Sequence, residues 1–180
     1  MAEHLFDKFF RFSAERLTAL GIPSDITEYL ATVGLPEWCA PHTHFGPPGD
    51  PATELALRQI DSAPYLVLGE DRDGDLIALA LGTYDVWVLP EGDPVYVASD
   101  VQELSASLHK FQACIDCAIA TDSQAFVQTR VAPSHLGPFV SWAKAVNPGL
   151  IGHGSYWHRE LVRLGLPPDS LSATFADGRP

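Results

Sequence analysis

The sequence predicts an α+β fold with a central antiparallel β-meander flanked by helices. Four short apolar runs, at residues 65–68, 76–81, 86–89 and 95–97, are separated by connections rich in Gly, Asp and Pro. Runs of this length between such residues are typical of strands. The connections are too short to hold a crossover helix, so consecutive strands are expected to run antiparallel. An amphipathic helical pattern that follows the meander supplies the α part of the prediction.

Helical patterns also precede the meander. Apolar residues within 3–20, among them Phe9 and Phe10, recur at helical spacing, so we expect a helix that places both phenylalanines in the core. A second helix is predicted over 24–33. The Pro- and His-rich stretch 36–51 that comes next is typical of an ordered surface loop.

Acidic residues gather on the turns of the predicted meander. Between Glu70 and Glu103 the sequence holds nine Asp or Glu residues and a single Arg. The turn at 70–75 has the composition of a calcium loop without its spacing, and its Asp-Gly pair favours a type I′ or bulged hairpin turn. The predicted partner-binding residues are Glu70, Asp71, Asp73, Asp75, Asp85, Trp87, Glu91 and Asp93, with Tyr84 and Tyr96 as further aromatic candidates.

The strands of the meander differ in their predicted burial. The run at 76–81 is apolar at every position, as expected of a central strand covered on both faces. Asp85, Trp87 and Tyr96 give the next two runs a half-exposed character. Strand alternation alone leaves open whether Trp87 faces the core or a partner.

A long amphipathic helix is predicted directly after the meander. Ser99 and Asp100 can cap it, and the helical pattern extends to about Ile119. Its apolar residues form one stripe at spacings of three and four, which we expect to cover one face of the meander. The stripe consists of Val101, Leu104, Leu108, Phe111, Ile115 and Ala118.

The C-terminal third is predicted to be mainly helical. Helical patterns cover 138–146 and 156–164, and residues 125–131 have the pattern of a strand or extended segment. The final residues lack periodicity, which is typical of a loose tail. We expect a single domain over residues 1–180, with a core at about 24–118, a C-terminal extension at 119–166 and the tail at 167–180.

The chain is strongly acidic. Its net charge is −12, and only three of its eleven basic residues are Lys. Such a charge repels phosphate and attracts cations, so nucleic-acid and anionic-membrane partners are disfavoured and a basic protein partner is favoured. Acidity can also serve solubility alone, and composition does not distinguish the two.

Cysteine usage and the N-terminal residues predict the compartment. Three cysteines, an odd number, argue against a secreted disulfide framework. The N-terminal residues interrupt their apolar positions with charge and lack the apolar region of a signal peptide. No apolar run approaches the roughly 20 residues needed to span a bilayer. We therefore expect a soluble, reduced, cytoplasmic protein.

Two groups of cysteine and histidine could carry chemistry. Cys39, His42 and His44 offer soft and borderline ligands for Zn²⁺ if a fourth ligand comes from elsewhere in the chain. Cys114 and Cys117 form a C-x-x-C pair in the later part of the predicted long helix, where the helix dipole does not favour a thiolate. Core or loop packing is the expected role of these residues, so we predict no metal, no cofactor and no catalytic set.

The order of these elements is recognisable. A helix ending in VGLP, a proline-rich loop, YLVLGEDRDGDLIALAL, DVWVL and VYVASDVQEL leading into a long helix together resemble the SUKH superfamily, specifically its fourth group. The similarity continues through AVNP and YW in the C-terminal third and covers about residues 24–166. The matching residues are Gly34, Leu35, Pro36, Leu68, Gly69, Gly74 and Trp157.

The resemblance implies an antiparallel sheet flanked by helices and a role as an immunity protein that binds and blocks a polymorphic toxin. The group shares no catalytic set, and its toxin-binding residues vary, so no binding residue is carried over. The expected partner is a basic toxin domain. Two alternatives stay open: a metal-binding or redox protein or enzyme that uses the Cys and His residues named above, and a general protein-interaction scaffold.

Overall fold

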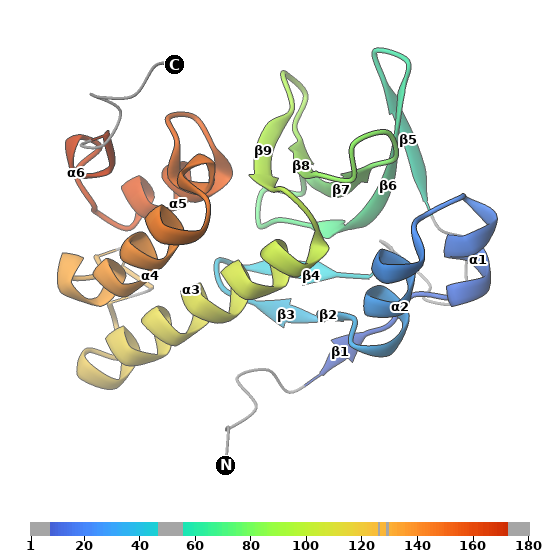
Figure 1. The fold of residues 1–180 in the computed structure, drawn as a ribbon. Helices are drawn as coiled ribbons and strands as arrows, with labels where there is room; N and C mark the ends of the chain where they lie inside the picture. Colours follow the sequence, from blue (N-terminus) through green and yellow to red (C-terminus); the bar gives the residue numbers. More distant parts are fainter. Residues whose placement is uncertain (1–7, 47–55, 126, 129, 173–180) are drawn as a thin grey trace. The chain divides into compact units, whose positions relative to one another are not determined.

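The computed structural model describes residues 8–46, 56–125, 127–128 and 130–172 and has two compact units (Figure 1). The N-terminal unit comprises residues 1–108 and the C-terminal unit residues 109–180. In the described residues these units contain two antiparallel sheets, six α-helices and one 3-10 helix, so the predicted α+β fold with a central meander is confirmed. The sequence predicts one domain over residues 1–180, with a core that ends near residue 118 and a C-terminal extension after it. That division stays a prediction.

The first described residues form a strand. Strand β1, Phe9–Phe10, pairs antiparallel with β2, Leu35–Pro36, in a separate two-stranded sheet. The helix predicted over 3–20 is therefore wrong at this point, and both phenylalanines are half-buried strand residues. Helical spacing was present, but pairing with a distant strand overrides local pattern. Among the described residues of that range the helix, α1, covers Ala14–Ala19, and residues 3–7 of the prediction lie outside the described residues.

A second helix, α2, covers Ser24–Thr32, close to its predicted range. It contacts α1, and the amide of Phe12 donates a hydrogen bond to the Leu30 carbonyl at 3.0 Å. Gly34 follows the helix with φ +80°, the left-handed conformation that ends helices before a proline.

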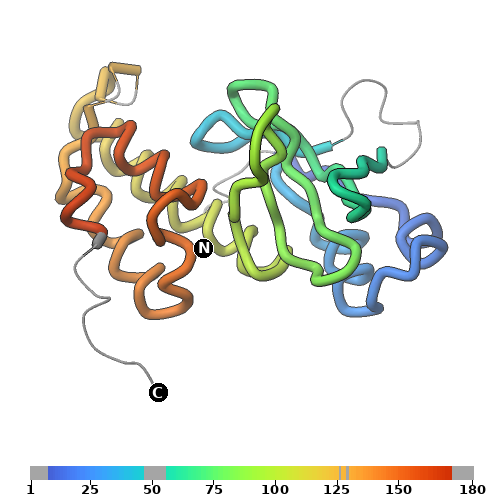
Figure 2. The backbone as a smooth tube through the Cα atoms, turned by 90° about the horizontal axis from the view of Figure 1, so that it is seen from above, coloured from blue at the N-terminus to red at the C-terminus, as the bar shows by residue number. Residues whose placement is uncertain are grey.

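The main sheet of the N-terminal unit has seven strands in the order β3-β4-β6-β7-β8-β9, and β5 also pairs with β6. All of its pairs are antiparallel. Figure 2 shows the strands of the meander running side by side. The strands are β3 Trp38–Cys39, β4 Thr43–Phe45, β5 Leu57–Ile60, β6 Ala63–Glu70, β7 Leu76–Ala80, β8 Val86–Leu89 and β9 Val95–Ala98.

The first two of these strands correct the sequence analysis. A surface loop was expected over 36–51, but its described part contains β3 and β4. Strands of two and three residues are too short to produce a readable alternation. Residues 47–51 of the expected loop lie outside the described residues.

The meander has one fully buried face and one half-exposed face. Register places Leu79 between Leu66 and Val86, and all three are buried. On the other face Ala78 lies between Val67 and Trp87. Positions 77–80 of β7 are all buried, so the predicted central strand is confirmed.

Helix α3, Val101–Thr121, begins and ends close to its predicted bounds. Its start is capped as predicted: Asp100 Oδ1 accepts a hydrogen bond from the Glu103 amide at 2.7 Å. Glu103 Oε2 in turn accepts one from the Ser99 amide at 2.7 Å. These two bonds connect the first turn of the helix to the residues that precede it and satisfy the amides of Ser99 and Glu103.

The apolar stripe of α3 is divided between the two units. Leu104 and Leu108 are buried within residues 101–108, which belong to the N-terminal unit. Phe111 belongs to the C-terminal unit, where its ring centroid lies 5.4 Å from that of Phe139 and 5.2 Å from that of Trp157. The second half of the stripe therefore contributes to the core of the C-terminal unit, and that it also covers the meander stays a prediction.

In its described residues, the C-terminal unit has helices as its only regular structure. Its core joins Phe111, Phe139 and Trp157, whose indole is fully buried. No strand occurs in the described part of 125–131, contrary to expectation. Within the described ranges, no helix combines the length and apolar composition needed to cross a membrane. Besides α3, the helical segments are α4 Pro133–Val146, η1 Pro148–Ile151, α5 Tyr156–Arg163 and α6 Asp169–Ser172, the last within the segment predicted as a tail.

Candidate partner-binding surface

The acidic hairpin between β6 and β7 is closed by its own first carboxylate. Asp71 Oδ1 accepts hydrogen bonds from the amides of Asp73 at 2.9 Å and Asp75 at 3.1 Å. The Gly74 amide donates to the Asp71 carbonyl at 3.1 Å, and Gly74 has φ +81°. This geometry is a bulged turn, as predicted from the Asp-Gly pair. Asp71 therefore shapes the hairpin, while the Asp73 side chain is exposed.

Burial, with a smaller contribution from neighbouring negative charge, perturbs the titration of Asp71. Burial raises the pKa of the Asp71 carboxyl above its ordinary value, and the neighbouring carboxylates of Asp75 and Asp73 raise it further. The two backbone hydrogen bonds act in the opposite direction. A site where carboxylates disfavour one another's charge gains from a cationic partner.

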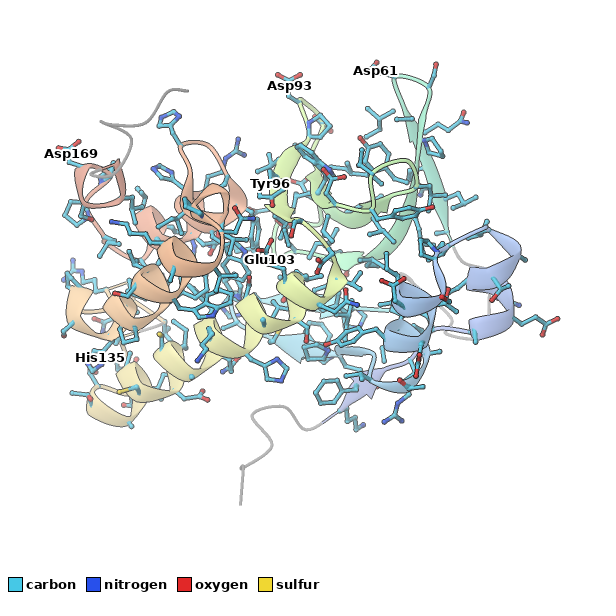
Figure 3. The ribbon with its side chains drawn as sticks, in the orientation of Figure 1. Asp61, Asp93, Tyr96, Glu103, His135 and Asp169 are labelled. Atoms are coloured by element: carbon cyan, nitrogen blue, oxygen red, sulfur yellow. The ribbon has the colours of Figure 1, made fainter. Side chains whose placement is uncertain are left out.

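Strand register brings two acidic turns to the same end of the sheet. Leu76 at the start of β7 pairs with Glu70 on one side and with Leu89 on the other. The turns that follow Glu70 and Leu89 therefore leave the sheet at one end, and Figure 3 shows Asp93 at the tip of the β8–β9 hairpin. We call this group the acidic end: Glu70, Asp71, Asp73, Asp75, Glu91 and Asp93.

Asp85 lies apart from the acidic end. It belongs to the β7–β8 turn, at the opposite end of the sheet, where its carbonyl accepts a hydrogen bond from the Ala80 amide at 2.9 Å. Its carboxylate accepts a hydrogen bond from the Thr83 hydroxyl. Tyr84 in the same turn is half-buried and has φ +64°. The predicted acidic residues therefore lie at two ends of the sheet: Asp85 at one end, and the acidic end at the other.

Trp87 lies on the half-exposed face of the meander. It pairs with Tyr96 across β8 and β9, and the two rings meet edge to face with centroids 5.6 Å apart. Both side chains are half-buried, whereas Val86 and Val88 on the opposite face are buried. The question left open by strand alternation is settled in favour of the half-exposed face for Trp87.

Sequence reasoning missed an exposed tryptophan at the edge of the same face. Trp38 on β3 is 67% exposed, and its ring packs on His44 with centroids 4.3 Å apart. Trp38 pairs with His44, and His44 pairs with Glu70 of the acidic end. Only the register of β3 and β4 makes this neighbourhood visible, and neither strand has a sequence signal.

The cysteine and histidine residues of β3 and β4 are arranged for packing. Cys39 Sγ and Thr43 Oγ1 are hydrogen-bonded at 2.8 Å, and burial raises the pKa of Cys39 to about 12. A metal ligand would have to be the thiolate, which this environment disfavours. His42 is exposed, and His44 packs on Trp38. In the part of the chain that the structure describes, His, Cys, Asp and Glu nowhere gather in groups of three or more that could hold a metal ion.

Cys114 and Cys117 occupy different environments on α3. Cys114 is buried and Cys117 is exposed. Burial raises the pKa of the Cys114 thiol, and the neighbouring Cys117 raises it further. A redox-active C-x-x-C pair depends instead on a lowered thiol pKa, so the redox alternative gains no support from this helix.

These elements define an α+β protein whose sheet has an acidic end and a half-exposed aromatic face. The model of the SUKH-4 immunity protein family matches residues 3–132, which is most of the chain. The chain therefore belongs to the SUKH-4 immunity protein family, and this membership supports an immunity function. No curated protein matches the chain, and no solved structure does.

Proposed function

We propose that this protein binds and neutralises a cognate polymorphic toxin through the acidic end of its sheet. Membership of the SUKH-4 immunity protein family supports the role. The observation that carries the binding surface is the pairing of Leu76 with both Glu70 and Leu89, which gathers six carboxylates from two hairpins. The proposed partner is a basic toxin domain.

Charge gives this surface its selectivity. The chain carries a net charge of −12. One basic residue, Arg72, lies in the same hairpin as Asp71 and Asp73, and its Nε is 3.4 Å from Asp73 Oδ2. Opposite charge on a partner accelerates the encounter and is screened by salt. Fast association would let the protein capture a toxin before the toxin acts.

Aromatic side chains beside the acid would provide the energy of the bound state. Trp87 and Tyr96 lie half-buried on the sheet face and hold each other edge to face. Large aromatic residues with little freedom to lose are typical hot spots of protein interfaces. The acidic end would steer the toxin, and the aromatic face would retain it.

The test uses the toxin domain encoded beside the gene for this chain, if that neighbour is a secreted protein with a basic C-terminal domain. The two proteins are co-expressed, co-purified and assayed for protection of cells. The triple variant Asp73→Asn, Glu91→Gln, Asp93→Asn should associate at least tenfold more slowly at low salt, and the difference should shrink in high salt.

A matched control removes the same charge elsewhere. Glu28, Asp61 and Asp169 are exposed and lie outside the acidic end. The variant Glu28→Gln, Asp61→Asn, Asp169→Asn should stay within about twofold of the wild type. If both triple variants lost the same factor in association rate, the net charge of the chain, and not the acidic end, would explain the effect. A wild-type chain that neither binds the toxin nor protects cells, yet binds ordinary cellular proteins, would favour the scaffold alternative.

A further inference from the structure

Trp38, His44 and Glu70 form one row across three neighbouring strands. Trp38 of β3 lies opposite His44 of β4, which lies opposite Glu70 of β6. Side chains directly opposite each other in antiparallel strands project from the same face, with β-carbons about 5 Å apart. The row therefore runs from the edge of the sheet into the acidic end.

The indole of Trp38 is held in place although it is exposed. It is 67% exposed, and its ring lies 4.3 Å from the His44 ring at a tilt of 40°. This contact packs the Trp38 ring against His44, the middle residue of the row. A ring that is already ordered and accessible loses little conformational freedom when a partner covers it.

We propose that this row receives an arginine side chain of the toxin, stacked on Trp38 and paired with Glu70. The proposal rests on the proposed function and names the chemistry of its contact. A guanidinium is planar, always charged and weakly hydrated, so it can lie on an indole face while it donates hydrogen bonds to a carboxylate. Lysine has no planar group to stack and would bind less well.

Charge complementarity selects this occupant over an apolar one. Glu70 is followed directly by Asp71, Asp73 and Asp75, so the field at the inner end of the row is negative. An apolar segment would cover Trp38 but would desolvate the half-buried Glu70 carboxylate without compensation. A basic segment can both stack on Trp38 and pair its charge with Glu70, so it gains binding energy at each end of the row.

Two variants and two matched controls test the contact by titration calorimetry with the same toxin domain. Trp38→Ala should weaken binding at least tenfold, and Trp38→Phe should fall between this variant and the wild type. Glu70→Gln should weaken binding and reduce its dependence on salt. Leu57→Ala removes another exposed apolar side chain, and Asp61→Asn another exposed carboxylate, at the far end of β6.

Coupling between the two residues gives a second readout. If one arginine contacts both, the double variant Trp38→Ala, Glu70→Gln should lose less than the product of the two single losses. On the toxin, Arg→Lys at the contacting position should weaken binding while conserving charge. Circular dichroism and thermal unfolding establish that each variant is folded, and Trp38→Phe preserves the test if Trp38→Ala does not fold.

The experiments distinguish a failure of the arginine contact from a failure of the proposed immunity function. If the wild type binds the toxin but Trp38→Ala stays within twofold of it, the arginine contact is wrong and the immunity role stands. If the wild type does not bind the toxin, both proposals fall. If sedimentation of the chain alone shows a dimer that Trp38→Ala dissociates, the row binds a second copy, and the arginine proposal is overturned.

Discussion

The α-carbon of Gly69 faces the carbonyl oxygen of His44 across the β4–β6 pair, so closely that a β-carbon at Gly69 would overlap that oxygen. The nearest contacts are backbone atoms of His44 and Phe45, which cannot turn aside as a side chain can. Gly69 thereby permits the pairing that sets His44 beside Glu70. The row of Trp38, His44 and Glu70 therefore depends on a residue without a side chain at position 69.

Gly69→Ala should therefore destabilise the N-terminal unit. Overpacking against fixed backbone typically costs about 1–3 kcal/mol of unfolding free energy, which urea denaturation measures. Gly82→Ala is the matched control, because a β-carbon there has no neighbour within 4 Å. Equal stability of the two variants would contradict the predicted contact between β4 and β6.

Arg163 should stabilise the C-terminal unit by neutralising a buried carboxylate. Its Nε and Nη2 donate to Glu160 Oε2 at 2.9 Å and 2.7 Å, and Glu160 is only 6% exposed. Arg163→Ala removes these two hydrogen bonds and the paired charge from a buried carboxylate, so we expect a loss of about 1–3 kcal/mol, discounted for the partly exposed arginine.

A double variant separates pairing from packing. Glu160→Gln with Arg163→Met removes both charges and should recover much of the loss measured for Arg163→Ala. Arg159→Ala, an exposed arginine of the same helix, serves as the control at neutral pH. If the double variant were as unstable as the single one, the carboxylate would not be the cause.

The C-terminal unit should lose stability as the pH falls below neutrality. His158 is buried, and its Nε2 has no hydrogen-bond partner among the described residues. Burial lowers the pKa of His158 below its ordinary 6.5, and the neighbouring His153 and Arg159 lower it further. The unfolded chain therefore takes up a proton first, and unfolding free energy falls as the pH drops from 6.5 toward the lower folded-state value.

Unfolding measured between pH 7.5 and pH 5 checks this direction. His158→Gln should flatten the dependence on pH, because it removes the titrating group. His135→Gln removes a half-buried histidine of α4 and should preserve the wild-type slope. A wild-type slope that persists in His158→Gln would assign the effect to other groups.

One thiol should react quickly in the folded protein. Burial raises the pKa of Cys39 to about 12 and that of Cys114 above its ordinary value, so both stay protonated at pH 8, while Cys117 is exposed. A disulfide reagent at pH 8 should show one fast thiol in the native chain and all three after denaturation. Cys117→Ser should abolish the fast phase, and a fast phase that survives would contradict the burial of the other two.

The meander could be predicted because each of its signals is local. Apolar runs, an Asp-Gly turn and short connections together fix four antiparallel strands. The acidic end needed one further step, since only register shows that Glu70 and Leu89 flank the same residue, Leu76. Acidic composition predicted an acidic surface, but it did not separate Asp85 from the rest.

What could not be predicted depends on distant partners. Phe9 and Phe10 have helical spacing, yet they pair with β2 and form a strand. Trp38 joins the candidate surface only through strands of two and three residues. The later half of α3 has the same apolar period as its first half, and the sequence does not show that Phe111 packs on Phe139 and Trp157. Periodicity shows that a face is covered and does not show what covers it.

Helix α3 contributes side chains to two cores, and this determines what a shortened chain would expose. The family match ends at residue 132, and α4 begins at Pro133. A chain cut at that junction would keep Phe111 but lose Phe139 and Trp157, whose rings pack against it. The later half of the helix would then present apolar side chains to water, which favours aggregation.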